Sequence, residues 1–148
     1  MQTHVLDYLA EAVAKAPERT AYCGETHSGE MYRLSFLEVY EQSLAVGTFL
    51  HQKGIYREPV VIFMEKCPKT IAAFYGVIAG GNYYIPVDVE MPENRIRLIL
   101  QNVKSGMMIC DAATIEHARD FEFEGQIVDY DEICYTEADK EALDRIYE

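Results

Sequence analysis

The first third of the chain carries apolar residues at helical spacing, with one turn-rich interruption. Leu6, Leu9 and Val13 lie three or four positions apart, and Pro17 follows them. This spacing predicts an amphipathic helix that ends before the proline. Two short strand-like runs then surround residues 24–29, which begin and end with glycine. Such a pattern is typical of a β-hairpin.

A second helix is predicted from residue 35 onward. Ser35 and Glu38 have the S-x-x-E spacing of a capping box, in which each side chain accepts a hydrogen bond from the other residue's backbone N–H. Apolar and small residues then continue at helical spacing as far as Leu50. Gly54 suits the left-handed turn that closes a helix.

From residue 60 onward, continuous apolar runs alternate with helical segments. The apolar runs are VVIFME, YYIPV, MMIC and QIV, and the helices between them begin near Pro68, Pro92 and Asp111. Strands that are covered on both faces read as continuous apolar runs, and they occur in parallel sheets. The order therefore predicts an α/β fold: a doubly wound parallel sheet with helices on both faces, plus the N-terminal helix and the hairpin.

Composition limits the possible partners. The chain has 148 residues, 49% of them hydrophobic, which favours a single domain over residues 1–148. A formal net charge of -12 argues against nucleic acid as a partner. Asp7 and Glu11 interrupt the N-terminus before a signal peptide could form, and no apolar run would span a membrane, so we expect a soluble, cytoplasmic protein. The acid-rich end at about 130–148 is expected to be solvated and mobile.

The cysteines and histidines do not predict a metal site. No two of them have the paired spacing of a zinc or redox site, and we interpret the four thiols as reduced and buried: Cys23, Cys67, Cys110 and Cys134.

Acids follow each predicted parallel strand: Glu65, Asp88, Asp111 and Asp129. Because the carboxyl ends of parallel strands lie along one edge of a sheet, these acids could hold a divalent cation. The alternative, which we favour, is that each acid caps the helix that follows its strand and interacts with the positive end of that helix.

Two long stretches resemble motifs of a known family. YRLSFLEVYEQSLAVGTFL is similar to the first core motif of the adenylate-forming ligases, in particular the amino-acid adenylation domains. VVIFMEKCPKTIAAFYGVIAGGNYYIPVDVEMPENRI resembles their second core motif, with mild departures at Gly80, Val89 and Met91. The positions that match the family are Ser35, Glu38, Gly81, Tyr84, Pro86, Asp88, Pro92 and Arg95.

The resemblance implies the N-terminal subdomain of a longer enzyme. Such enzymes use ATP and Mg²⁺ to convert a carboxylate to an acyl-adenylate, and then pass the acyl group to a thiol, commonly the phosphopantetheine of a carrier protein. The subtypes implied are nonribosomal peptide synthetase modules and D-alanine–carrier protein ligases, with coenzyme A ligases as an alternative.

The family's phosphate loop and C-terminal lid have no counterpart in residues 1–148. We therefore expect no catalytic, cofactor-binding or metal residue here, and we expect an inactive scaffold that partners the remainder of the enzyme and self-associates through exposed apolar surface. Two other hypotheses are a freestanding, non-catalytic α/β binding or regulatory module, and a degenerate relative that keeps half of the ligase as an interaction surface.

Overall fold

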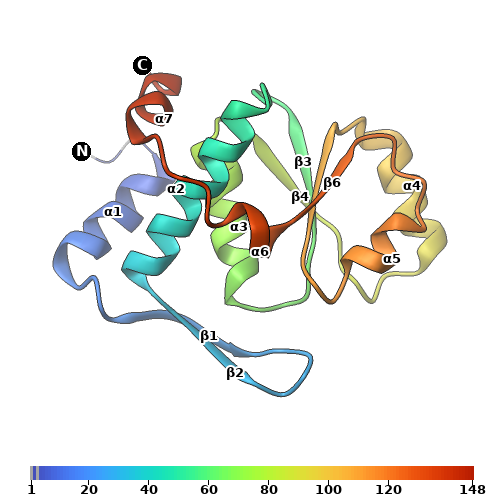
Figure 1. The fold of residues 1–148 in the computed structure, drawn as a ribbon, viewed down its shortest axis with the longest axis horizontal. Coiled ribbons are helices and arrows are strands. Elements are labelled where there is room, and N and C mark those ends of the chain that lie inside the picture. The colour runs from blue at the N-terminus through green and yellow to red at the C-terminus, as the bar shows by residue number, and fades with distance from the viewer. Residues whose placement is uncertain (1, 3) are drawn as a thin grey trace.

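The computed structural model describes residue 2 and residues 4–148 (Figure 1). The helices are α1 (Val5–Lys15), α2 (Phe36–Gln52), α3 (Pro68–Ala79), α4 (Glu93–Val103), α5 (Ile115–Arg119), α6 (Tyr130–Ile133) and α7 (Lys140–Ile146). The strands are β1 (Thr20–Glu25), β2 (Met31–Ser35), β3 (Pro59–Phe63), β4 (Tyr83–Pro86), β5 (Met107–Cys110) and β6 (Gln126–Asp129). No helix in this described part of the chain has the length and apolar character that crossing a bilayer requires.

The four later strands form one parallel sheet in the order β4-β3-β5-β6, which confirms the predicted fold class. Alternate strand residues pack to opposite faces, because successive side chains point to opposite sides of a sheet. Val60 and Ile62 pack in the core shared with α2 and α3, whereas Val61 and Phe63 pack in the core shared with α4 and α5. Helices therefore cover both faces, as Figure 1 shows.

Small residues let α2 and α3 lie close together. A Cβ atom on Gly76 would lie 2.5 Å from the Cβ atom of Val46, so only glycine fits at this crossing. The buried Ser43 hydroxyl donates to the Val39 carbonyl within α2 (2.6 Å) and to the Ala72 carbonyl of α3 (3.3 Å). The two helices form the main layer over one face of the sheet.

The predicted N-terminal helix and hairpin are both present. Strands β1 and β2 pair antiparallel, from Thr20 opposite Ser35 to Glu25 opposite Met31. The hairpin loop is tied to the end of β3, because the His27 N–H donates to the Glu65 carboxylate (3.1 Å).

The acidic C-terminal end packs on the domain through a few apolar residues, while most of its acids are exposed to solvent, as expected. Tyr130, Ile133 and Leu143 are buried. The Asp139 N–H donates to the Thr48 hydroxyl of α2 (3.0 Å), and the Tyr147 hydroxyl donates to the Ile78 carbonyl. The acids lie on the outer side of α6 and α7, and the few apolar residues between them dock on the sheet-covering helices.

Candidate functional site

The carboxyl edge of the sheet is where a ligand would be sought first. In open parallel α/β sheets, ligands bind outside the carboxyl ends of the strands where the strand order reverses. The order β4-β3-β5-β6 places this reversal between β3 and β5. Glu65 follows the end of β3 and Asp111 follows the end of β5, so these two predicted acids border the crevice.

Asp111 closes that crevice. Its side chain is buried, and one carboxylate oxygen accepts the Glu65 N–H across the gap (2.9 Å). The other oxygen accepts the N–H groups of Ala113 and Thr114, each at 3.0 Å. The Thr114 hydroxyl donates to the Phe63 carbonyl at the end of β3 (2.6 Å). The carboxylate is thus engaged by the chain itself on both oxygens, and it joins β3 to β5 where a ligand would otherwise enter.

The sequence analysis missed the role of Thr114. The signal was present, because Asp111 and Thr114 are three positions apart, a spacing at which an aspartate and a hydroxyl can bond to each other's backbone. What the sequence could not give is the contact with Phe63, which is far away in the chain.

The other strand-end acids also accept backbone N–H groups. Asp88 accepts the Glu90 N–H (2.9 Å) and pairs with Lys66 (3.1 Å), and both interactions hold the pKa of the Asp88 carboxyl below its usual value. Asp129 caps α6 by accepting the Asp131 N–H (2.9 Å).

Helix capping, the interpretation that we favoured, is therefore correct for Asp129 alone. The helices that follow Glu65, Asp88 and Asp111 have other N-cap residues and no side-chain cap. Over residue 2 and residues 4–148, no three His, Cys, Asp or Glu side chains converge where a metal ion could be held.

Three of the family-motif positions have clear structural roles. Ser35 and Glu38 form the predicted capping box, with the Glu38 N–H donating to the Ser35 hydroxyl (3.1 Å) and the Ser35 N–H donating to the Glu38 carboxylate (3.0 Å). Gly81 has a φ of 79°, and an added Cβ would lie 2.7 Å from the Cγ2 atom of Ile146. These residues shape helix starts and turns.

The remaining motif positions lie along β4 and the start of α4. The Tyr84 ring stacks on the Phe74 ring of α3, with centroids 4.2 Å apart. Pro86 ends β4, Pro92 is the N-cap of α4, and Arg95 lies exposed in its first turn. The structure does not gather the motif positions into one site.

Most of the thiols are shielded from ionisation. Burial raises the pKa of the Cys110 thiol to about 12 and also raises those of Cys67 and Cys134. Cys23 is exposed, and Cys67 and Cys134 are only partly buried, so the expectation that all four cysteines are buried is confirmed for Cys110 alone.

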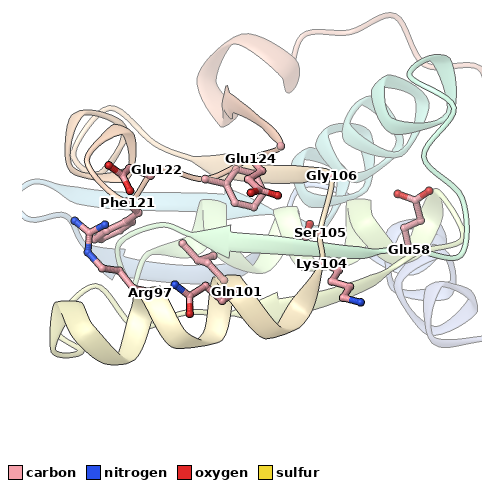
Figure 2. A pocket seen from close by; sticks show the side chains of 12 residues that line it. Glu58, Arg97, Gln101, Lys104, Ser105, Gly106, Phe121, Glu122 and Glu124 are labelled. Carbon is pink, nitrogen blue, oxygen red and sulfur yellow. The ribbon is translucent and has the colours of Figure 1, made fainter.

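A cavity of about 830 Å³ lies at the opposite, amino edge of the sheet. Figure 2 shows Arg97 and Gln101 of α4 and Lys104, the residue after this helix, lining the cavity, with Glu122 and Glu124 on the loop that leads into β6. The Arg97 guanidinium is already engaged by the Glu93 carboxylate (2.7 Å) and the Asp120 carbonyl (2.8 Å). With acids on its rim and its arginine paired, the cavity does not form a phosphate cradle.

Comparison with known proteins decides the family. The AMP-binding enzyme model matches residues 9–145, which is most of the chain. The chain belongs to the AMP-binding enzyme family. Membership in this family confirms the resemblance to adenylate-forming ligases that the core motifs indicated.

Relatives in the AMP-binding family are much longer than this chain. The D-alanine–D-alanyl carrier protein ligase of Listeria monocytogenes is 33% identical over 112 residues, which are 74% of this chain and 21% of the ligase. Tyrocidine synthase 1 of Brevibacillus parabrevis is 29% identical over 126 residues, which are 84% of this chain and 11% of the synthase. Thus the chain spans about a tenth to a fifth of the length of these relatives.

Solved structures of the AMP-binding family share the fold. McyG A-PCP, solved in complex with phenylalanyl-adenylate, superimposes with a TM-score of 0.78 at 15% identity. The match covers 93% of this chain and 27% of that structure's chain.

Proposed function

We propose that these 148 residues are the N-terminal subdomain of a cytoplasmic adenylate-forming ligase. The whole enzyme uses ATP and Mg²⁺ to convert a carboxylate, an amino acid, to an acyl-adenylate, and then transfers the acyl group to the phosphopantetheine thiol of a carrier protein. The observation that carries this proposal is the family match over residues 9–145, together with relatives named D-alanine–D-alanyl carrier protein ligase and tyrocidine synthase 1.

The chemistry is assigned to the remainder of the enzyme. Transfer of a phosphoryl or adenylyl group requires aligned N–H donors, cations and a metal ion around the phosphates. The residues described here do not fit ATP or Mg²⁺, because Asp111 fills the crevice at the carboxyl edge and the strand-end acids are bonded to backbone N–H groups. No reaction step is therefore routed through this chain, which supports the sheet and the adjoining loops.

The test is made on the native polypeptide. An antibody raised against residues 1–148 would isolate it from its source cell, and mass spectrometry would give its intact mass. We expect a mass several times 16.9 kDa. The isolated polypeptide should catalyse ATP–pyrophosphate exchange with one amino acid from a panel that includes D-alanine.

The 148-residue protein serves as the control in the same exchange assay. It should give no exchange with any amino acid, because the family's phosphate loop has no counterpart in its sequence. A native polypeptide of 16.9 kDa would overturn the proposal and favour the freestanding, non-catalytic module. Exchange by the 148-residue protein above background would also overturn it, since the chemistry would then lie within this chain.

A further inference from the structure

The two edges of the parallel sheet differ in their free backbone groups. In a parallel pair, alternate residues of a strand bond to its neighbour. The N–H groups of Tyr83 and Val87 donate to carbonyl groups in or beside β3 (3.2 and 3.0 Å), so the intervening Tyr84 and Pro86 face outward. Because Pro86 has no N–H, Tyr84 holds the single outward donor of β4.

The other edge, β6, keeps its donors. The Gln126 N–H donates to the Gly106 carbonyl beside β5 (2.9 Å). Gln126 and Val128 are therefore the residues of β6 whose backbone groups face β5. Alternation then turns Ile127 outward with its N–H and carbonyl groups. It also turns the Asp129 N–H outward, while the Asp129 carbonyl faces the first turn of α6, which Asp129 caps. Edge β6 therefore offers two donors where β4 offers one, and a further strand would form a better ladder there.

The segment of the chain that contains β6 is rich in acids. Residues 120–139 contain eight Asp or Glu and no Lys or Arg. Asp131 is neutralised by Lys69 of α3 (2.6 Å). Glu122 and Glu124 lie on the loop that enters β6, beside the cavity of Figure 2. A segment with basic ends would be attracted to this edge, whereas a second copy of this chain, with its own charge of -12, would be repelled.

We propose that the outer edge of β6 accepts an extended polypeptide segment with basic ends, supplied from outside these 148 residues. The backbone of the segment pairs with the outward groups of Ile127 and Asp129, and one basic end lies against Glu122 and Glu124. β-Branched residues in its centre suit the partly buried side chain of Ile127. The proposal is independent of the catalytic function proposed above, because no reaction step enters it.

The first test is a peptide titration followed by amide NMR of the 148-residue protein. The probe is the synthetic peptide KKVTVTVKK, and its matched control is EEVTVTVEE. We expect the basic peptide to shift the amides of Ile127 and Asp129 and to slow their hydrogen exchange, while the Tyr84 amide is unaffected. The acidic peptide should not bind, and added salt should weaken the basic peptide's binding.

Two proline variants test whether the peptide binds at the β6 edge or at the β4 edge of the sheet. Ile127→Pro removes an outward donor of β6 and should weaken binding of the basic peptide about tenfold. Tyr84→Pro removes the outward donor of β4 and should leave binding unchanged. Both substitutions fall where an edge strand tolerates proline, so both variants should keep the wild-type circular dichroism spectrum.

Four results would overturn the proposal: no binding at millimolar peptide, equal binding of the acidic peptide, shifts centred on β4, or unchanged binding by Ile127→Pro. Concentration-dependent shifts at Ile127 without peptide would assign the edge to a second copy and would also overturn it. If Ile127→Pro does not fold, the amide map of the wild-type protein decides alone.

Discussion

At the scale of single residues, the Asp111 carboxylate accepts backbone N–H groups at the carboxyl ends of β3 and β5. Every group bonded to its side chain is a backbone donor, namely the N–H group of Glu65, Ala113 or Thr114. A carboxylate can satisfy all of them because both of its oxygens accept. An amide of the same shape cannot, since its NH₂ group would face another donor.

Asp111→Asn is therefore expected to lower the free energy of unfolding by about 2 kcal/mol, because the partly buried Glu65 N–H loses its acceptor. Urea denaturation followed by circular dichroism measures the change. The matched control is Glu116→Gln, at an exposed position of α5, which should change the free energy of unfolding by less than about 0.5 kcal/mol. Equal stability of the two variants would show that the hydrogen bond from the Glu65 N–H to the Asp111 carboxylate contributes little to the free energy of unfolding.

At the scale of elements, the turn from α3 to β4 depends on a contact made by the last helix. Gly54 and Gly81 both have a positive φ, 73° and 79°. An added Cβ on Gly54 would meet nothing within 4 Å, whereas on Gly81 it would meet Ile146 of α7 at 2.7 Å and Tyr56 at 2.9 Å. Substitutions at Gly54 and Gly81 therefore distinguish the cost of backbone strain alone from the cost of strain combined with overpacking.

We predict that Gly54→Ala lowers the free energy of unfolding by about 1 kcal/mol, the cost of the left-handed conformation alone. Gly81→Ala should cost about 3 kcal/mol, because overpacking against α7 adds to the same strain. Thermal and urea unfolding of both variants provide the measurement. Similar losses for the two variants would mean that α7 does not press on this turn in solution.

The same elements show what a sequence can predict. The strands were predictable because β3 and β5 are continuous apolar runs, and α2 because of Ser35 and Glu38. The docking of α7 could not be predicted, because one buried leucine, Leu143, among charged residues gives no recognisable apolar face. The hydrogen bond from the Asp139 N–H to Thr48 joins residues 91 positions apart. For the candidate site, the acids were visible in the sequence, but the bond from Asp111 to Glu65 exists only in three dimensions.

At the scale of the whole molecule, net charge and exposed apolar surface oppose each other. The charge of -12 repels like copies, while Tyr83 on the β4 edge keeps 54% of its surface exposed and lies next to the exposed Tyr84. Repulsion between exposed charges falls as salt rises, but the apolar attraction does not. Self-association should therefore depend on ionic strength.

We predict that the sedimentation coefficient of the 148-residue protein rises with protein concentration, and rises more steeply at high salt. Sedimentation velocity from micromolar to millimolar protein, at low and high sodium chloride, measures this. Tyr83→Lys should reduce the rise, because it places a strongly hydrated charge in the apolar patch. Tyr135→Lys is the matched control, since Tyr135 is more exposed but lies outside β4. Monomeric behaviour under all conditions would contradict the prediction, and an equal effect of both lysines would attribute any change to charge alone.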